Sequence, residues 1–404
     1  MSKAQQNFSV VTNDAEKPGP SQPSSVSGGR SLRSTTKRNA SSEDTGPAPK
    51  MAAKVEEWSI ESICRNGRRL DLNSDQPNAA SVIKTLFKEV HGSVLSKLNI
   101  HPLDWDECAD NELTPFLETF NKRVRAFRKN NPRDVLLSKK NWRQKDAKEF
   151  RILCDLACQL AIPDPTVLNT QYKGFSNETY GETNIETLQK ILDTLDVKED
   201  DVFIDLGSGV GQLVTFAAAY TNMALVRGIE IQEVPAGFAD ENAWQFKKLM
   251  RHFGEKPRPF QLELGDFTKK ETETFLKEKA TIIFCNNKAF KEPLMLKLRE
   301  ILQFCNSGTK IVVTQRLETT KDGRTSRGCY FTASADTVSL FTTDDPKKGN
   351  VSWTDKIVPY YLTTVDNMKP FREAAKKEKA EEQAQVAKQL RAEQRRAKKE
   401  AKKQ

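Results

Sequence analysis

The chain has 404 residues, enough for one large or two medium domains with tails, and its low hydrophobic content of 37% predicts that part of it lies outside a packed core. The apolar runs are too short to span a membrane and no hydrophobic stretch follows Met1, which excludes a membrane-spanning class and predicts no secretory signal. A net charge of +9 predicts a polyanionic partner such as nucleic acid or chromatin, and seven scattered cysteines without a C-x-x-C pair predict a reducing compartment and argue against a zinc site.

Residues 1–52 are rich in Ser, Pro, Gly and Asn and contain almost no large apolar side chains, a composition typical of a disordered tail. The basic residues in this tail fit nuclear import or DNA contact as well as they fit a solvated linker. They are Arg30, Arg33, Lys37 and Arg38. The rest of the chain is predicted to divide into a mostly helical subdomain over 53–184, a second domain over 185–368 and a basic tail over 369–404.

The N-terminal subdomain is predicted to begin with a hairpin and to continue as helices. Asn66-Gly67 separates two apolar segments, which is a strong hairpin signal. From Ala79 to about Leu160, apolar residues recur at helical spacing and prolines punctuate the pattern.

A polar and aromatic segment over residues 171–183 precedes a predicted helix from Ile185 to Leu195. Two interpretations of this segment are open. Thr183 could be the N-cap of the helix, with Glu186 completing a capping box. Alternatively, because the segment lies shortly before a glycine-rich turn, it could cover a bound ligand.

The stretch from Asp201 to Gln212 combines a short buried strand, a glycine turn and the start of a helix. Such a turn brings backbone close to a ligand, and the helix start offers unpaired N–H groups. The pattern is G-x-G-x-G led by Asp205, whereas dinucleotide sites have G-x-G-x-x-G. A carboxylate at the strand end suits an ammonium group, such as the methionine end of S-adenosylmethionine, and would repel a pyrophosphate.

Two further predicted strands end in residues that suit the rest of S-adenosylmethionine. The strand over 224–230 ends in Glu230, about where a carboxylate binds ribose hydroxyls. The strand over 260–265 is followed by Asp266, an acceptor for the adenine amino group, and by Phe267, a ring that can stack on adenine. The three strand ends together predict S-adenosylmethionine as the cofactor.

From residue 201 onward strands and helices alternate, which predicts a doubly wound, Rossmann-like α/β sheet with ligands at the carboxyl ends of its strands. Further strands are expected at 280–286, 309–314, 337–341, 351–353 and 358–365, the last three as antiparallel edge strands. Residues 371–404 contain twelve Lys or Arg and six Glu in an Ala-rich composition, which predicts a single exposed helix. That helix could be merely solvated or could bind phosphates or acidic protein.

Asn286-Asn287 ends the fourth strand of this alternation, where the reacting centre of such a fold would lie. A neutral acceptor there could orient an amine for attack on a sulfonium methyl group, although a turn-forming Asn pair is equally compatible. A lysine amine has a pKa of about 10.4 and must first lose its proton, which an apolar channel would favour by desolvation. Candidate walls of that channel, each of which could be ordinary core, are Phe267, Phe290, Trp353 and Tyr360.

Together these stretches resemble the disruptor-of-telomeric-silencing family, the nucleosomal histone-lysine methyltransferases that lack a SET domain. The resemblance covers roughly residues 80–366. The matching segments are Tyr180-Gly-Glu-Thr183, Val202–Gln212, Gly228-Ile-Glu230, Gly265-Asp-Phe267, Phe284-Cys-Asn-Asn287, Val351-Ser-Trp-Thr354 and Tyr360-Tyr361.

The resemblance implies an S-adenosylmethionine-dependent protein-lysine N-methyltransferase of the nucleus, acting on a lysine on the folded face of histone H3 in nucleosomes. It implies that basic tails help to bind the nucleosome. Separately, we expect no membrane partner and a monomer. Asn286 and Tyr360 would be the catalytic residues lining the lysine channel. The implied cofactor-binding residues are Tyr180, Gly181, Glu182, Thr183, Phe203, Ile204, Asp205, Leu206, Gly207, Ser208, Gly209, Val210, Gly211, Gln212, Glu230, Asp266 and Phe267.

Two segments depart from the family pattern. Lys288 stands where the family has an aromatic residue, and Thr314-Gln-Arg-Leu317 replaces a Ser-Ser-Lys-Pro pattern. Both bear on the rate and on the number of methyl groups added more than on cofactor binding. Two alternatives follow: a methyltransferase of RNA or DNA, which the basic charge allows, and a nucleosome-binding module with weak or no catalysis, which Lys288 motivates.

Overall fold

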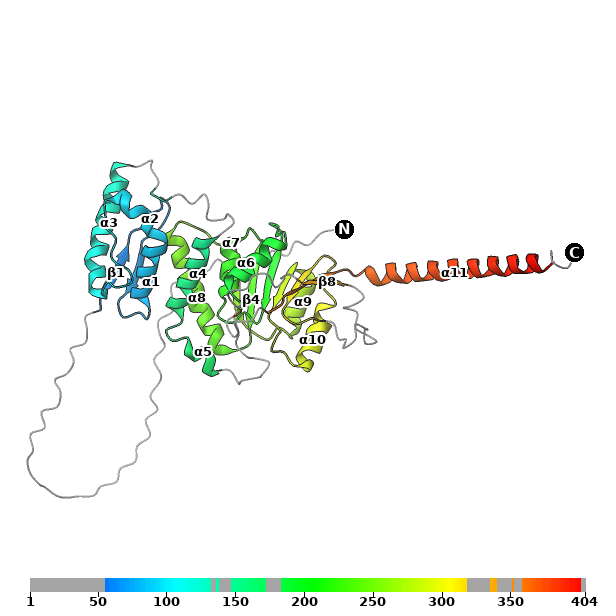
Figure 1. Ribbon diagram of the computed structural model, residues 1–404. Coiled ribbons are helices and arrows are strands. Elements are labelled where there is room, and N and C mark those ends of the chain that lie inside the picture. Colours follow the sequence, from blue (N-terminus) through cyan, green and yellow to red (C-terminus); the bar gives the residue numbers. More distant parts are fainter. Residues whose placement is uncertain are drawn as a thin grey trace, which may run out of the picture. The chain divides into compact units, whose positions relative to one another are not determined.

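The computed structural model describes residues 55–131, 136–137, 147–171, 183–317, 335–339, 351 and 358–400. Lys54–Gln404 forms one compact unit, in which a hairpin and helices precede a large sheet with helices on both of its faces (Figure 1). The predicted N-terminal tail lies outside the described residues.

The predicted hairpin is confirmed, but its connection is not the tight Asn-Gly turn that the sequence suggested. β1 (Glu57–Ile60) pairs antiparallel with β2 (Leu70–Asn73), and nine residues connect them. This connection bends onto the C-terminal end of helix α8 (Glu233–His252), where the Arg68 N–H donates to the Arg251 carbonyl at 2.9 Å. The connection is therefore held by a helix that is distant in the sequence. It forms a longer loop than a tight turn would, and the two strands are correspondingly shorter.

Helices follow the hairpin, as predicted. They are α1 (Ala79–Leu86), the π-helix η1 (Phe87–His91), α2 (Gly92–Leu95), η2 (Ser96–Leu98), η3 (Asp110–Glu112), α3 (Leu113–Asn130), α4 (Lys148–Ala161) and α5 (Thr166–Gln171). Their apolar stripes are buried, so the helical periodicity of the sequence reflects a packed face.

The sheet confirms the predicted doubly wound α/β fold. Its strands are β3 (Val202–Leu206), β4 (Leu225–Glu230), β5 (Phe260–Leu264), β6 (Ile282–Cys285), β7 (Lys310–Val313), β8 (Ala335–Ser339) and β9 (Tyr361–Val365). Their spatial order is β5-β4-β3-β6-β7-β9-β8; the first five are parallel, and β9 runs antiparallel to both of its neighbours, β7 and β8. The order reverses between β3 and β6, so a ligand is expected at the carboxyl ends of these two strands.

Two layers of helices cover the sheet. The helices of this part are α6 (Ile185–Thr194), α7 (Gln212–Tyr220), α8 (Glu233–His252), α9 (Lys270–Glu278) and α10 (Glu292–Leu302). Phe203 packs in one core with α6, α7 and α8, whereas its neighbour Ile204 packs in a second core with α9 and α10. Successive strand residues thus serve opposite faces. The sequence analysis missed α9, a short helix whose only large apolar residues are Phe275 and Leu276.

The first core also includes the N-terminal helices. α4 lies alongside α8, and Phe150 and Leu153 belong to the same buried cluster as Phe246 and Leu249 (Figure 1). Apolar packing therefore runs continuously across residue 184, the boundary drawn from the sequence.

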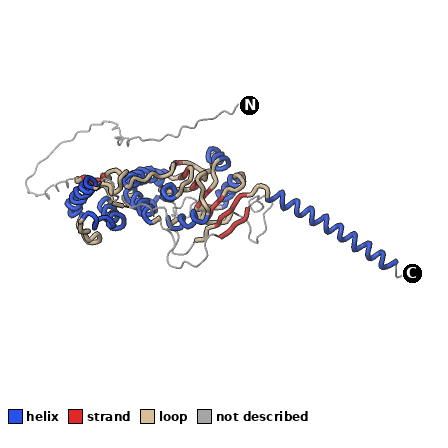
Figure 2. The backbone as a smooth tube through the Cα atoms, turned by 90° about the horizontal axis from the view of Figure 1, so that it is seen from above, coloured by secondary structure: helices blue, strands red, loops and turns tan. Residues whose placement is uncertain are grey.

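The C-terminal helix α11 (Lys369–Glu400) is one uninterrupted element, as the tube in Figure 2 shows. Its side chains from Phe371 to Gln394 are exposed, as the sequence predicted. No described helix has the length and apolar character needed to cross a bilayer.

Candidate functional site

The glycine turn after β3 contains glycines with different roles. The N–H groups of Gly207 and Ser208 both donate to the Ile229 carbonyl, at 2.9 and 3.1 Å, which ties the turn to β4. Gly207 has a φ of +89°, and a Cβ built there would meet no atom of the described residues within 4 Å. In contrast, a Cβ at Gly228 would lie 2.7 Å from the Ser208 side chain. Gly207 therefore borders space that a ligand can use. Gly228, to which the sequence analysis gave no role of its own, permits close packing beneath the turn.

Two carboxylates lie at this end of the sheet, and their surroundings differ. Glu230 accepts hydrogen bonds from the N–H groups of Gly209 and Gln232, both at 2.9 Å. Asp205 is only 2% exposed, and none of the residues that the structure describes donates a hydrogen bond to it. Burial first, and then the charge of Glu230, raise the pKa of Asp205 well above its usual value. A cationic group placed beside Asp205 would favour its ionised form and offset this cost of burial.

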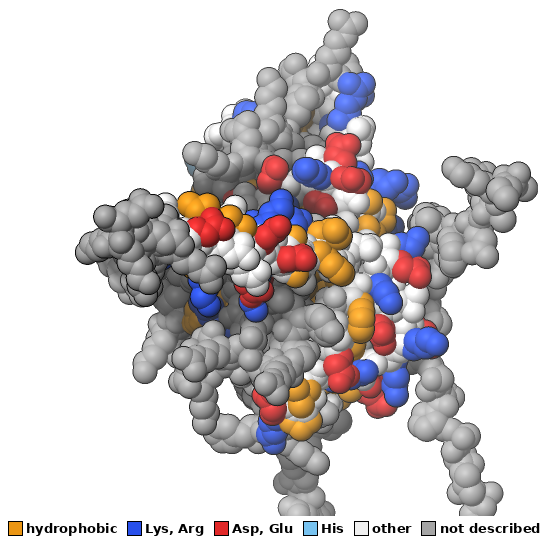
Figure 3. Space-filling model, turned by 90° about the vertical axis from the view of Figure 1, so that its right-hand side faces the viewer, with side chains coloured by type: hydrophobic (Ala, Val, Ile, Leu, Met, Phe, Trp, Pro, Cys, Tyr) orange, Lys and Arg blue, Asp and Glu red, His pale blue; other side chains and the backbone are white. Residues whose placement is uncertain are grey.

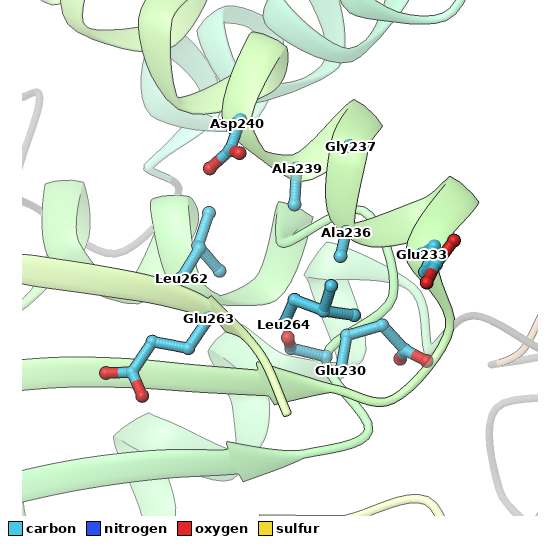
Figure 4. Close-up of a pocket in the computed structure, with 10 residues that line it drawn as sticks. Glu230, Glu233, Ala236, Gly237, Ala239, Asp240, Leu262, Glu263 and Leu264 are labelled. Atoms are coloured by element: carbon cyan, nitrogen blue, oxygen red, sulfur yellow. The ribbon is translucent and has the colours of Figure 1, made fainter. Parts of the chain in front are cut away.

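A hollow of about 210 Å³ opens beside Glu230 (Figure 4). Its floor comes from the ends of β4 and β5, and Ala236, Ala239 and Asp240 of α8 form its other side. Ile231, which directly follows Glu230, is 48% exposed. Sequence reasoning passed over Ile231, although an exposed apolar side chain beside an acid at a strand end offers a flat apolar surface to a ligand.

The end of β5 presents the predicted Asp266 and Phe267. Asp266 Oδ1 accepts from the backbone N–H and the hydroxyl of Thr268, at 2.8 and 2.7 Å, so this side chain also shapes the turn into α9. Phe267 is half-buried and stacks on Phe290, with ring centroids 5.9 Å apart. The structure thus brings together two of the four rings that were proposed as channel walls.

Asn286 and Asn287, at the end of β6, have separate tasks. Asn287 is fully buried and accepts the backbone N–H groups of Thr314 and Gln315 at 3.0 and 2.7 Å. Asn286 is partly exposed, and its Oδ1 accepts the Thr314 hydroxyl at 2.9 Å. The turn-forming interpretation therefore suits Asn287, and Asn286 is the member of the pair that can face a ligand. Thr314 was noted in the sequence only as a departure from the family pattern.

Tyr360, the other predicted catalytic residue, is buried, and its hydroxyl lies 2.7 Å from Thr183 Oγ1. Its ring stacks on Phe284, and desolvation raises the pKa of its hydroxyl. Thr183 forms an isolated β-bridge with Val351. Thr183 is therefore a contact of the site and not the N-cap of α6, which is Asn184, so the capping-box interpretation is wrong. Val351 pairs with Thr183 and not with the edge strands expected for it.

The remaining predicted residues of the glycine stretch serve mainly the core. Phe203, Ile204 and Leu206 are buried in the two hydrophobic clusters, and Val210 packs in a third with residues of α4 and α5. Only their backbone could reach a ligand. Gln212 donates to Asp155 of α4 at 2.8 Å, a link that nothing in the local sequence indicated. Tyr180, Gly181, Glu182 and Trp353 lie outside the described residues.

Residues 158–365 match a family model described as histone methylation protein DOT1, which accounts for just over half of the chain. The chain belongs to the DOT1 family. The resemblance found in the sequence is therefore confirmed at the level of the family, over the same strands that carry Asp205, Glu230 and Asn286.

Members of the DOT1 family with curated names extend this match. A Caenorhabditis elegans protein named "Histone-lysine N-methyltransferase, H3 lysine-79 specific" is 37% identical over 320 residues, covering 77% of this chain and 33% of that protein. A Drosophila melanogaster protein of the same name is 31% identical over 274 residues, covering 68% of this chain and 14% of that protein. The chain thus spans a third or less of the length of these relatives.

Among solved structures, an RNA methyltransferase from Salinibacter ruber in complex with S-adenosyl-L-homocysteine is similar to 45% of this chain and 92% of its own, with 21% identity and a TM-score of 0.30. The strand order and the family match, and not this distant likeness, define the fold.

Proposed function

We propose that this DOT1-family chain is a histone-lysine N-methyltransferase that transfers a methyl group from S-adenosylmethionine to a lysine of histone H3 within the nucleosome. The observation that carries the proposal is Asp205, a buried carboxylate without a described donor beside a glycine turn that borders open space. A pyrophosphate would be repelled there, whereas an ammonium group would compensate the buried charge.

The residues present suit S-adenosylmethionine along its whole length. Asp205 fits the amino group of its methionine part, Glu230 the ribose hydroxyls, and Asp266 the adenine amino group. Phe267 and the exposed Ile231 offer apolar surface to the adenine ring. When bound, the cofactor supplies an electrophilic methyl group on a sulfonium centre.

The chain's own residues would prepare the lysine. A free lysine amine is protonated at neutral pH and cannot act as a nucleophile. The stacked rings of Phe267 and Phe290 and the buried Tyr360 provide apolar surroundings that disfavour the ammonium form. Asn286 offers a neutral amide to hold the amine in line with the reacting bond. Catalysis would then come from orientation and desolvation, without a strong base.

The nucleosome is proposed as the substrate because of the family and the charge of the chain. On the face of the molecule seen in Figure 3, Lys and Arg side chains are interspersed with Asp and Glu. The most concentrated basic stretch is instead in the C-terminal tail, where Arg395-Arg-Ala-Lys-Lys399 lies within α11. This helix could contact DNA phosphates while the sheet acts on the histone. A nuclear location follows from that substrate.

One experiment separates this function from its alternatives. Purified protein and labelled S-adenosylmethionine are offered nucleosomes, free histone H3, RNA and DNA, and the modified residue is mapped by mass spectrometry. Label on an H3 lysine of nucleosomes is the expected result. Label confined to RNA or DNA contradicts the proposal, and nucleosome binding without methyl transfer would indicate the non-catalytic module that Lys288 motivates.

A further inference from the structure

The buried face of α8 contains two carboxamide side chains where helical spacing calls for apolar residues. Asn242 and Gln245 are 0% and 1% exposed, and they lie on the same face of the helix as the buried Ala239 and Phe246. Neither Asn242 Oδ1 nor Gln245 Oε1 has a hydrogen-bond partner among the residues that the structure describes. A buried amide oxygen without a partner lowers stability, so each of these side chains requires an explanation.

The nitrogen atoms of the two side chains donate to different partners. Gln245 Nε2 donates to Glu241 Oε1 at 2.9 Å, within the same helix. Asn242 Nδ2 instead donates at 2.9 Å to the Val210 carbonyl, which lies 32 residues away in the sequence and inside the glycine turn. Asn242 therefore links α8 to the turn, whereas the hydrogen bond of Gln245 stays within α8.

The Val210 carbonyl determines the direction of the next N–H group in the turn. In a trans peptide the C=O and N–H groups point in opposite directions. With the carbonyl held by Asn242, the Gly211 N–H points back into the turn, where it donates to the Ser208 carbonyl at 2.9 Å. Gly209 and Gly211, on either side of Val210, have φ of +54° and +76°. Because glycines rotate freely, this peptide group needs a tether to keep one orientation.

We propose that Asn242 is a positioning residue for S-adenosylmethionine, whose side chain holds the glycine turn in its binding conformation before the cofactor binds. A turn that is already fixed binds a ligand without the entropy loss of ordering it. A turn that is correctly formed for only a fraction of the time has its affinity reduced by that fraction. The unpaired Asn242 Oδ1 is then a loss of stability that accompanies a gain in binding. This inference rests on the site proposed above, in which the turn holds the methionine part of the cofactor.

Asn242→Leu and Gln245→Met are a matched pair of variants, because each replaces a buried carboxamide of α8 by an apolar side chain of similar size. Each removes one hydrogen bond and one unpaired buried oxygen, so their effects on the melting temperature should be small and similar. In calorimetry, Asn242→Leu should raise the Kd for S-adenosylmethionine about fivefold, the value of a typical neutral hydrogen bond. Gln245→Met should leave the Kd within about twofold of wild type. Asn242→Ala, which cannot overfill the site, should raise the Kd as Asn242→Leu does and replaces that variant if leucine prevents folding.

Nucleosome methylation gives a second readout. Because the bound cofactor holds the turn in the same conformation in both proteins, Asn242→Leu should raise the KM for S-adenosylmethionine about fivefold and leave kcat at saturating cofactor within about twofold. A substitution that merely damaged the fold would lower kcat as well, and such a loss of kcat would contradict a positioning role.

A third readout requires neither cofactor nor substrate. In ¹⁵N-labelled protein, the Gly211 amide should exchange with solvent faster in Asn242→Leu than in wild type, and at the wild-type rate in Gln245→Met. Wild-type affinity in the Asn242 variants, an equal loss of affinity in Gln245→Met, or unchanged exchange at Gly211 would each overturn the proposal. A wild-type protein that binds no S-adenosylmethionine would instead overturn the proposed cofactor site, and this inference with it.

Discussion

His91 Nε2 lies 3.1 Å from His252 Nε2, and both rings are fully buried between the N-terminal helices and the end of α8. His252 Nδ1 lies 2.9 Å from the Arg68 carbonyl, which can only accept, so this nitrogen carries the proton. In a neutral His252 ring, Nε2 must then accept from His91. This hydrogen bond requires a neutral His252 ring, and the pair joins the hairpin connection, η1 and α8 at one point.

The first prediction is that acid weakens this junction. Desolvation lowers the pKa of His252 to about 4 and, with the charge of His252, lowers the pKa of His91 well below 6.5. The pKa values of both rings are lower in the folded than in the unfolded protein. The neutral rings therefore stabilise the fold fully above the unfolded pKa of about 6.5, and this stabilisation is lost as the pH falls toward 4. His252 alone should lower the free energy of unfolding by about 3 kcal/mol over this range.

Urea denaturation between pH 7.5 and pH 4.5 measures this effect. His91→Gln should be less stable at pH 7.5 but should show a shallower pH dependence, since one titrating ring is gone. His101 is exposed, so His101→Gln should reproduce the wild-type slope. A wild-type stability that does not change between pH 7 and pH 5 would disprove the assignment of neutral rings.

The second prediction separates the binding glycine from the packing glycine. An arginine at Gly207 would extend into the open space of the turn, so Gly207→Arg should abolish detectable S-adenosylmethionine binding in calorimetry. Because position 207 has a positive φ, which side chains other than glycine disfavour, the substitution should also lower the free energy of unfolding by about 1 kcal/mol. Gly308 has a φ of +94° and also faces open space, so Gly308→Arg is a control with the same strain and intact binding.

Gly228→Ala should instead lower stability by about 1–3 kcal/mol through overpacking. Equal binding by the two arginine variants would refute the assigned role of Gly207.

The third prediction concerns the two acids. Asp205→Asn removes a buried charge that lacks a described donor, so it should raise the melting temperature of the free protein while weakening S-adenosylmethionine binding at least tenfold. Because the pKa of Asp205 is raised, its ionisation destabilises the fold as the pH increases, and the gain should therefore be larger at pH 8 than at pH 5. Glu230→Gln should instead lower the melting temperature, since Glu230 accepts two N–H groups. A less stable Asp205→Asn variant would contradict this account.

The sequence predicted the fold because strands and helices alternate regularly from residue 201 onward. Asp205, Glu230 and Asn286 could be recognised since their type and their place after an apolar run are local features. The partners of these residues are not local: Thr314 lies 28 residues from Asn286, and Tyr360 lies 177 residues from Thr183. Thr183 was ambiguous for that reason, because a threonine before a helix looks like an N-cap until Tyr360 is known to reach it.

The fourth prediction concerns Lys288, which is exposed directly after the buried Asn287. If this cation lies at the entrance of the lysine channel, it repels the incoming substrate. Lys288→Phe should then raise kcat/KM for nucleosomes severalfold and shift the mixture of mono-, di- and trimethylated products, without changing the melting temperature. Mass spectrometry of the methylated histone measures both effects. Lys279→Phe, at the opposite end of β6, should change neither quantity, and an identical product mixture in Lys288→Phe would exclude a role for this position.

The fifth prediction concerns the basic helix. If α11 binds DNA, a protein ending at Asn367 should bind nucleosomes more weakly at low salt, and the slope of log K against log salt should become shallower by roughly one unit for each phosphate that α11 neutralises. Replacing Arg395, Arg396, Lys398 and Lys399 by glutamine should have most of the same effect while leaving S-adenosylmethionine affinity unchanged. A control variant has glutamine in place of Glu378, Glu381 and Glu382. This change makes α11 more positively charged, so nucleosome binding should become stronger. Nucleosome affinities that are equal in all these proteins at 50 mM salt would show that the remaining chain holds the nucleosome without α11.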